Sequence, residues 1–381
     1  MGSLDPLEKI VSTPGVTFDD VLLLPSYSEI KRRNIDLTTK LHESITLPLP
    51  IISSPMDTVT EDKMAIALAQ FGGLGVIHRN IEIEKQVGLV TEVKKTKPKD
   101  SSIAALDSKG RLLVSAAVGT GDDFHKRVKA LIDCDTDIIV IDSGHGYTKF
   151  IIDAVTYLRK TYPKQIVMAG NVATYDGAKA LINAGAHIIR VGMGPGSICT
   201  TRIVTGMGVP QITAVTEAIR AANKTKTTVV ADGGVKQIGD IAKALGFGAH
   251  AVMLGSMLAR YEEAPGKVVS IKGKQFKAYR GMGSVAAMQK GAAERYGQSQ
   301  KTKAQHLIAE GVEGFVSYGG SVETFLIQSS GSLRSSLYYV GAKNLKEFHE
   351  KARFIRISHA GLTESHPHTV VIDNAGENYI V

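Results

Sequence analysis

Eight short apolar runs rich in β-formers recur along the chain between residue 49 and residue 254, and helical patterns separate them. The runs are 49–52, 74–77, 112–117, 137–141, 165–168, 187–191, 228–231 and 249–254. Strands that alternate with helices predict a parallel sheet, and eight such units fit a closed (β/α)8 TIM barrel better than an open doubly wound sheet. Because the number of strands does not by itself close a barrel, the open sheet remains the alternative.

Residues with useful chemistry follow most of these runs directly. They are Ser54 and Met56, Asp142 and Ser143, Asn171, Cys199, Asp232 and Gly234, and Gly255 and Ser256. In a barrel the loops after the strands share the carboxyl-terminal face, where active sites are assembled, and the last two loops often bind phosphate on backbone amides. No strand is followed by G-x-G-x-x-G and an acidic ribose ligand, so a nicotinamide cofactor would not be held by a Rossmann fold.

Cys199 ends a glycine-rich loop, residues 194–202, and is one of only two cysteines in the chain. Glycines let a backbone approach a phosphate or an ion closely, and a thiol at the loop exit can attack carbon. A lone cysteine after a glycine turn is more often a small buried hydrophobe. The hydroxyls of Ser197, Thr200 and Thr201, with Arg190 upstream, favour a nucleophile acting on a phosphorylated substrate.

Composition excludes several other classes of protein. The formal net charge is +8, but the Lys and Arg residues are dispersed and no aromatic residues interleave with them, so we expect no nucleic-acid partner. No uncharged apolar run is long enough to span a bilayer, and no secretion signal begins the chain, so we expect no membrane partner. Two cysteines are too few for a disulfide framework or a zinc site, which fits a reducing cytoplasm.

Residues after about 257 do not continue the alternation of strands and helices. The segment of about 284–310 is rich in Lys, Gln, Gly and Ala, contains Arg295 and Tyr296, and predicts a mobile flap over the site, with a disordered linker as the alternative. A helix is expected near 345–353, within a C-terminal segment of about 345–381. We predict one catalytic domain over residues 1–381, with a flap and a C-terminal extension.

Several motifs together closely resemble the family of inosine 5′-monophosphate (IMP) dehydrogenase and its sibling, guanosine monophosphate reductase. The motifs are 13–25, 53–60, 194–202, 231–234, 279–284, 310–314 and 364–366. The resemblance covers nearly the whole chain. It implies a (β/α)8 barrel, assembled as a homotetramer, that oxidises IMP to xanthosine monophosphate with NAD in guanine nucleotide biosynthesis.

The resemblance also implies a covalent mechanism. Cys199 would attack C2 of the purine, hydride would pass to nicotinamide, and water would hydrolyse the thioimidate. A thiolate nucleophile splits one difficult step into two. Arg295 and Tyr296 would enter the vacated NAD site on the flap and activate water, with Thr201 and Glu310 as a second route for the proton.

Binding residues are carried over from the family in three groups. The substrate group is Ser54, Met56, Ser197, Asp232, Gly234, Gly255, Ser256, Tyr279, Met282, Gly283 and Glu310. The NAD group is Asp142, Ser143, Asn171, Arg190, Gly192 and Gly194. A potassium ion would bind the backbone carbonyls of Gly194, Gly196 and Cys199, joined by Glu364, Ser365 and His366 from a neighbouring copy, and oxygen ligands suit such a hard cation.

The chain departs from the family in one respect and leaves two alternatives. The family commonly carries a pair of cystathionine-β-synthase-like regulatory modules, but too few residues lie between about 90 and 110 for even one such domain. The alternatives are the NADPH-dependent reductase, which needs no flap that activates water, and a non-catalytic nucleotide-binding barrel. The pair Arg295–Tyr296 favours the dehydrogenase, and its retention with Cys199, Thr201 and Glu310 argues against a silent barrel.

Overall fold

The eight predicted strands close into a parallel barrel. The computed structural model describes residues 9–299, 301–373 and 378–379. The barrel strands are β4 (Ile51–Ser53), β5 (Leu74–Ile77), β6 (Val114–Val118), β7 (Ile138–Asp142), β8 (Ile166–Val172), β9 (Ile188–Val191), β10 (Thr228–Asp232) and β11 (Ala251–Leu254). Each strand pairs with its neighbours in parallel, and β11 pairs with β4, so that Val252 lies opposite Ile51. The predicted TIM barrel is confirmed, and the open sheet is wrong.

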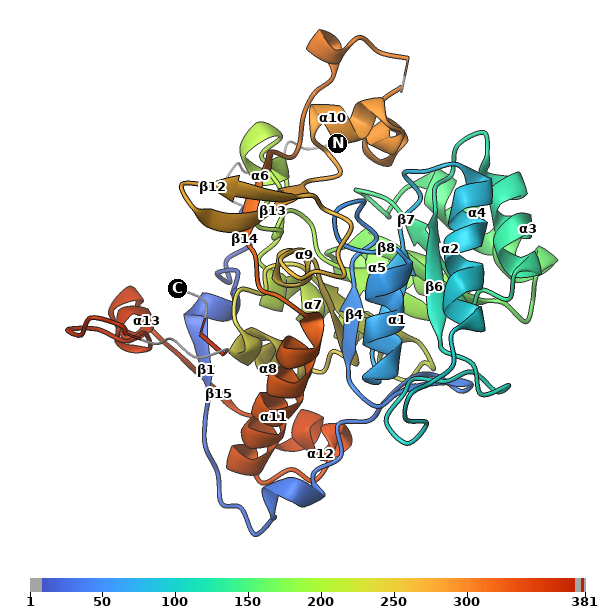
Figure 1. Ribbon diagram of the computed structural model, residues 1–381. Helices are drawn as coiled ribbons and strands as arrows, with labels where there is room; N and C mark the ends of the chain where they lie inside the picture. The colour runs from blue at the N-terminus through green and yellow to red at the C-terminus, as the bar shows by residue number, and fades with distance from the viewer. Residues whose placement is uncertain (1–8, 300, 374–377, 380–381) are drawn as a thin grey trace.

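Helices on the outside of the barrel connect the strands (Figure 1). They are α1 (Asp62–Gln70), α2 (Ile83–Lys95), α3 (Phe124–Asp133), α4 (Lys149–Thr161), α5 (Tyr175–Asn183), α7 (Gln211–Ala222) and α8 (Ile238–Gly246). The eighth outer helix is α11 (Val322–Val340), which packs against both α8 and α1. The expectation that the alternation stops after residue 257 is therefore wrong, because a long insertion separates β11 from its helix.

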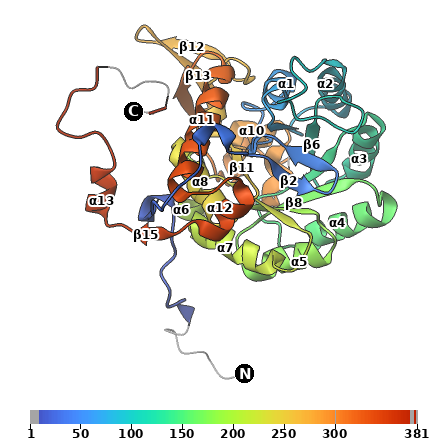
Figure 2. The ribbon, with the colours of Figure 1, turned by 90° about the horizontal axis from the view of Figure 1, so that it is seen from below.

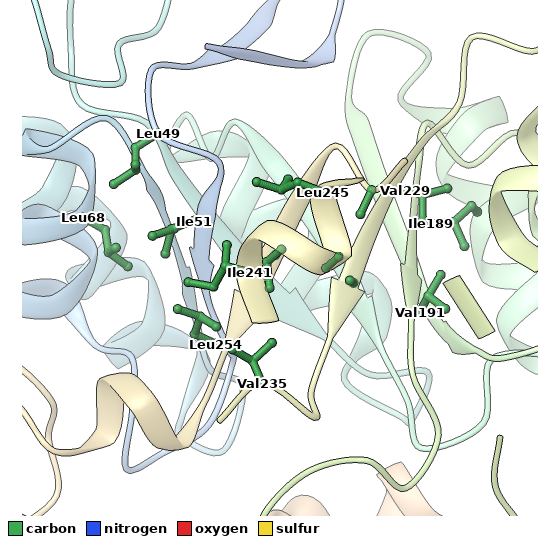
Figure 3. Close-up of a cluster of buried hydrophobic side chains, with 14 of the residues drawn as sticks. Leu49, Ile51, Leu68, Ile189, Val191, Val229, Val235, Ile241, Leu245 and Leu254 are labelled. Carbon is green, nitrogen blue, oxygen red and sulfur yellow. The ribbon is translucent and has the colours of Figure 1, made fainter. Parts of the chain in front are cut away.

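Alternate residues of each strand face the helices or the barrel interior. Along β10, Val229 belongs to the layer under the helices, and Val230 belongs to the cluster inside the barrel. In α8, Ile241 and Leu245 are spaced one helical turn apart and are fully buried. Figure 3 shows both side chains directed at the strands. Burying one such apolar side chain contributes about 1.5–3 kcal/mol to folding. The spacing of apolar residues along each helix or strand therefore decides which of its faces packs against the core.

A long insertion lies between β11 and α11 and forms a small sheet and several short helices outside the barrel. It begins with α9 (Ser256–Ala259) and forms an antiparallel sheet of β12 (Val268–Ile271), β13 (Lys274–Arg280) and β14 (Glu313–Ser317). Between β13 and β14 lie α10 (Val285–Gln289) and two 3-10 helices, η4 (Ala292–Tyr296) and η5 (Ala304–His306). These short elements occupy the segment predicted as a flap, and Figure 1 shows α10 above the barrel in orange.

The amino-terminal segment lies against the barrel and its outer helices. It contains η2 (Phe18–Asp20), β1 (Val21–Leu23), η3 (Arg32–Asn34), β2 (Thr39–His42) and β3 (Ile45–Leu47). Leu41 and Leu47 of the β2–β3 hairpin join the cluster of apolar side chains inside the barrel. The hairpin therefore closes one end of the interior.

The carboxyl-terminal segment begins with the predicted helix. It contains α12 (Leu345–Lys351), β15 (Phe354–Arg356), which pairs with β1, and α13 (His359–Glu364). The expected helix near 345–353 is confirmed by α12. Figures 1 and 2 show α13 away from the barrel. None of the helices in the described part of the chain combines the length and apolar character needed to cross a bilayer. The predicted single domain over 1–381 extends at both ends beyond the described residues.

Candidate active site

A cavity of about 640 Å³ opens at the carboxyl ends of the barrel strands, and all eight loops there contribute to its lining. Every residue predicted to act in catalysis or to bind substrate or NAD lines it. These residues are Ser54, Met56, Asp142, Ser143, Asn171, Arg190, Gly192, Gly194, Ser197, Cys199, Thr201, Asp232, Gly234, Gly255, Ser256, Tyr279, Met282, Gly283, Arg295, Tyr296 and Glu310. One cavity therefore joins loops that are far apart in the sequence, as the carboxyl-terminal face of a barrel allows.

Cys199 stands at the head of a chain of hydrogen bonds. Its thiol donates to Thr201 Oγ1 at 3.1 Å, and the Thr201 hydroxyl donates to Glu310 Oε2 at 2.8 Å. Thr201 is the first residue of α6 (Thr201–Val204), and its backbone N–H also reaches the sulfur at 3.5 Å. A proton leaving the thiol therefore has a continuous path to a carboxylate.

Backbone hydrogen bonds hold the cysteine loop against the strand that returns from the flap. The N–H of Thr200 donates to the carbonyl of Glu310 at 2.9 Å, and the N–H of Val312 donates to the carbonyl of Ile198 at 3.1 Å. Cys199 and Gly311 form an isolated antiparallel bridge. The position of the thiol therefore depends on the insertion as well as on the barrel.

Asp232 is held at the end of β10 by two buried side chains. Asn171 Nδ2 donates to Asp232 Oδ2 at 2.8 Å, and Arg190 Nε lies 3.0 Å from the same oxygen. Asn171 Nδ2 also donates to the carbonyl of Gly192 at 2.9 Å. The other carboxylate oxygen of Asp232 remains available to accept hydrogen bonds from a diol in the cavity.

Asp142 lies at the centre of a cluster of arginines. Arg190 Nη2 is 2.7 Å from Asp142 Oδ1, Arg295 Nη1 forms an ion pair with the same oxygen, and Arg79 Nε is 3.9 Å from Oδ2. Burial raises the pKa of Asp142, but the positive charges outweigh this effect and lower the pKa to about 2. The pKa of Arg79 is lowered by burial. The arginines therefore keep the Asp142 carboxylate ionised at neutral pH.

The region assigned to the phosphate is crowded around Gly255. A Cβ added there would lie 3.2 Å from Tyr279 Oη and 3.4 Å from Met56 Sδ, so a side chain would fill the space beside them. Burial raises the pKa of Tyr279, which therefore remains a hydroxyl donor at neutral pH. Gly233 and Gly234 both have positive φ, at 91° and 82°, which a residue with a Cβ would adopt at a cost.

The flap lies inside the cavity rather than away from it. The carbonyl of Arg295 accepts a hydrogen bond from the N–H of Gly144 at 3.0 Å, which joins η4 to the loop after β7. A Cβ added at Gly283 would lie 2.8 Å from the Tyr296 ring, so glycine allows the close approach. Burial acts to lower the pKa of Arg295, but Asp142 outweighs it and the pKa is raised, and burial raises the pKa of Tyr296.

Glu364, Ser365 and His366 are not brought to the site within this chain. They lie at the end of α13 and just beyond it, and all three side chains are exposed. Gly194, Gly196 and Cys199, the other predicted potassium ligands, line the cavity. Within the described ranges, no group of three or more His, Cys, Asp and Glu side chains is arranged to hold a metal ion.

Several residues that the structure connects to the site have no role predicted from the sequence. Arg79 follows β5 and lines the cavity beside Asp142. Asp57 and Arg280 form an ion pair just outside the lining. Asp57 and Arg280 lie within motifs that carried the family resemblance, next to the predicted contacts Met56 and Tyr279. Their charge and that position were the features of the sequence from which a role at the site could have been predicted.

Comparison with known proteins gives a consistent result. Residues 15–368 match the model of the IMP dehydrogenase / GMP reductase domain. The chain is 38% identical to inosine-5'-monophosphate dehydrogenase of Bacillus subtilis (strain 168) over 488 aligned positions, which cover 98% of this chain and 99% of the relative. The protein of the same name from Aquifex aeolicus (strain VF5) is 39% identical, covering 96% and 98%.

The relatives are longer than this chain. The 488 aligned positions exceed its 381 residues, so the Bacillus subtilis relative contains residues with no counterpart here. In this chain a loop of residues 96–113 joins α2 directly to β6. This loop covers most of the region of about 90–110 in which the sequence predicted that the regulatory modules are absent. The match to the family model and the identity over almost the whole chain establish that the chain belongs to the IMP dehydrogenase / GMP reductase family.

Proposed function

We propose that the chain oxidises IMP to xanthosine monophosphate with NAD through a covalent intermediate on Cys199. The relatives named above are IMP dehydrogenases. The hydrogen-bond chain from Cys199 through Thr201 to Glu310, in one cavity with Asp232 and the pair Arg295–Tyr296, carries the proposal. A nucleophile with a proton acceptor and a polar cradle is the set of groups that this reaction requires.

The first half-reaction makes and breaks bonds at C2 of the purine. The thiol proton passes by way of Thr201 toward Glu310, the sulfur bonds to C2, and the C2 hydrogen leaves as hydride. NAD bound in the same cavity supplies the hydride acceptor. The product of this half-reaction is a thioimidate, in which C2 has been oxidised by two electrons and remains bonded to Cys199.

The second half-reaction is hydrolysis, for which the flap replaces the reduced cofactor. Arg295 lies against Asp142, one of the residues assigned to NAD, so the closed flap and NAD use overlapping space. Water adds to C2, the C2–S bond breaks, and Cys199 regains a proton as xanthosine monophosphate is released. Because Asp142 raises the pKa of Arg295 despite burial, Arg295 acts as a cation that orients and polarises water. Glu310, after releasing the thiol proton to solvent, accepts the water proton by way of Thr201.

We propose for the binding residues the roles that the family resemblance implies, and their places in the lining of one cavity support this assignment. Asp232 would accept the ribose hydroxyls, and Gly234, Gly255, Ser256, Ser197 and Tyr279 would bind the phosphate. Met282, Gly283 and Glu310 would contact the base, beside Ser54 and Met56. Asp142, Ser143, Asn171, Arg190, Gly192 and Gly194 would face the nicotinamide riboside. Arg190 acts by orienting both carboxylates, since it contacts Asp142 and Asp232 and is 1% exposed.

A potassium ion and a homotetramer complete the proposal. The carbonyl of Gly196 accepts one hydrogen bond, from the N–H of Cys199 at 3.0 Å, and keeps a second lone pair. Carbonyl oxygens at the turn of residues 194–199 fit a hard monovalent cation, which would hold the turn in shape. Glu364, Ser365 and His366 are exposed, and we propose a cytoplasmic assembly in which they reach a neighbouring copy. Within this chain Ser365 Oγ donates to the carbonyl of Gly361 at 2.8 Å and His366 Nδ1 lies 2.8 Å from Tyr379 Oη, so these contacts would be exchanged in the assembly. The single catalytic domain would then be the repeating unit.

The first experiment follows NADH formation from IMP and NAD in the presence of potassium. Turnover that disappears in Cys199→Ala supports the covalent mechanism, and a single burst of NADH without turnover in Arg295→Ala supports the hydrolytic flap. Cys134→Ala is the matched control, because Cys134 follows α3, outside the cavity lining, and its thiol donates to the carbonyl of Leu131.

Two other results would overturn the proposal. Consumption of NADPH with guanosine monophosphate, without NADH formation from IMP, would make the chain the reductase. Nucleotide binding without either reaction would make it a non-catalytic barrel.

A further inference from the structure

Three polar side chains outside the cavity lining form a compact network beside it. Arg280 Nε donates to Asp57 Oδ1 at 3.1 Å, and Arg280 Nη2 donates to Asp57 Oδ2. Asn80 Nδ2 donates to the same Oδ2 at 2.7 Å. The Asp57 and Arg280 side chains are 7% and 17% exposed. A two-point guanidinium–carboxylate contact with little water around it fixes orientation as well as distance.

The network joins three segments that otherwise belong to separate parts of the fold. Asp57 follows β4, Asn80 follows β5, and Arg280 is the last residue of β13 in the insertion. The N–H of Arg280 also donates to Thr58 Oγ1 at 3.3 Å. The ion pair therefore ties the end of β13 directly to the first two loops of the barrel.

Asn80 is itself held in place and reaches the base of the flap. Its N–H donates to His78 Nδ1 at 3.1 Å, and His78 Nε2 lies 3.3 Å from a carboxylate oxygen of Glu61. Asn80 Nδ2 also approaches the carbonyl of Ala287 in α10 at 3.5 Å. The Asn80 side chain thus contacts both Asp57 and the helix from which the flap departs.

Residues on both sides of Arg280 at the end of β13 line the cavity. Tyr279 precedes Arg280 and lines the cavity, and Met282 follows two residues later and also lines it. The N–H of Gly281 donates to the carbonyl of Val312 at 2.9 Å, and Val312 in turn binds the cysteine loop. A shift at Arg280 would therefore move the proposed phosphate and base contacts relative to Cys199.

We infer that Asp57, Asn80 and Arg280 are positioning residues, which set the distance between the Tyr279–Met282 contacts and the Cys199 loop and thereby the affinity for IMP. The inference rests on the proposed function, since it concerns the same substrate. None of the three side chains lines the cavity, so they act through the backbone they hold rather than by touching the substrate.

The charges of the pair favour its persistence in the folded chain. Burial raises the pKa of Asp57, but the bonds from Arg280 and Asn80 outweigh it and the pKa is lowered. The Asp57 bonds raise the pKa of Arg280. Both groups are therefore charged at neutral pH, and removing either one leaves the other partly buried without its partner.

The test measures protection of Cys199 from alkylation by iodoacetamide as IMP is added, which reports binding without requiring turnover. We expect Asp57→Asn to raise the IMP concentration for half-protection by about tenfold or more, because a displacement of about 1 Å costs up to about 100-fold when contacts are misplaced. Arg280→Lys keeps the charge but loses the two-point contact, so a smaller rise is expected. It also provides a second variant if Asp57→Asn does not fold.

A double variant and a matched control separate positioning from general damage. If the two residues act as one unit, Asp57→Asn with Arg280→Lys will shift half-protection no further than the larger of the two single effects. Asp107→Asn removes a comparably buried carboxylate, 3.0 Å from Lys94 Nζ, in the loop that precedes β6 at the opposite end of the barrel. This control should lower thermal stability and leave half-protection unchanged.

The outcomes are distinct. Three results would overturn the inference and leave the proposed function standing. The first is a double variant whose shift in half-protection is the product of the two single shifts, and the second is a shift in Asp107→Asn as large as that in Asp57→Asn. The third is an unchanged IMP concentration for half-protection in both Asp57→Asn and Arg280→Lys. Failure of IMP to protect Cys199 in the unsubstituted chain would refute the proposed function and, with it, the inference.

Discussion

Replacement of Asp142 by asparagine removes one negative charge from the centre of the arginine cluster while keeping the shape of the side chain. Asp142 is 3% exposed, and three guanidinium groups from Arg79, Arg190 and Arg295 face it. Asparagine resembles the protonated carboxyl group, which cannot neutralise those cations. The substitution therefore measures how much the ionised form of Asp142 contributes to folding.

The expected magnitude follows from the pKa. The pKa of Asp142 falls from 3.8 to about 2 in the folded chain, and each unit corresponds to about 1.4 kcal/mol. Because the folded pKa is depressed, the ionised group stabilises the fold above the unfolded value, and this contribution is lost as the pH falls through the folded value. We expect Asp142→Asn to lower the free energy of unfolding by about 2 kcal/mol near neutral pH and by about 1 kcal/mol near pH 3.

Urea unfolding of both chains at equal protein concentration, at several pH values from neutral down to about pH 3, measures the difference. The exposed pair Lys149–Asp153 provides the control, since Asp153→Asn should cost less than about 1 kcal/mol at every pH. A difference for Asp142→Asn that is the same at neutral and acid pH would refute the reasoning, because it would mean that ionisation of Asp142 does not stabilise the fold.

Substitutions at Thr201 and Gly192, each with a matched control, test two further features of the site. Thr201→Val removes the hydrogen-bond acceptor for the Cys199 thiol and should slow NADH formation by about 10- to 100-fold. Thr201→Ser keeps the hydroxyl and should keep most of the rate. Equal rates in the two variants would exclude proton transfer from Cys199 through Thr201 to Glu310. Gly192→Ala should lower the free energy of unfolding by about 2 kcal/mol or more, because φ is 151° and the new Cβ would overlap the carbonyl of Asp232. Gly239→Ala, in a helix with open space around it, should raise stability by up to about 1 kcal/mol when both are compared by urea unfolding.

The barrel and the location of the site were predictable because they depend on local patterns. All eight apolar runs became barrel strands, with end points that differ by at most four residues, and the loops after them meet at one face. Cys199, Thr201 and Glu310 were named from motifs, and the hydrogen bonds between them required the fold. Short apolar runs bounded by glycine leave little choice of structure.

The parts that were not predicted depend on contacts between distant segments. The helix α11 was missed because 67 residues, 255–321, separate it from β11, so no local rhythm connects them. The arginine cluster around Asp142 draws Arg79, Arg190 and Arg295 from three separate loops or strands, and charge pairing of this kind has no sequence period. The mobility of the flap, the potassium site and the tetramer stay predictions.

The insertion leaves and rejoins the barrel at almost the same point. The N–H of Glu262 donates to the carbonyl of Gly320 at 2.8 Å, the N–H of Gly319 donates to the carbonyl of Arg260 at 2.9 Å, and Ser321 Oγ donates to Glu263 at 2.9 Å. Because its two ends are fastened together, the length and sequence of the insertion can change with little effect on closure of the barrel. Closure of the barrel is thus mechanically separable from the insertion, whereas the Cys199 loop is not, because the N–H of Thr200 donates to the carbonyl of Glu310 at the far end of the insertion.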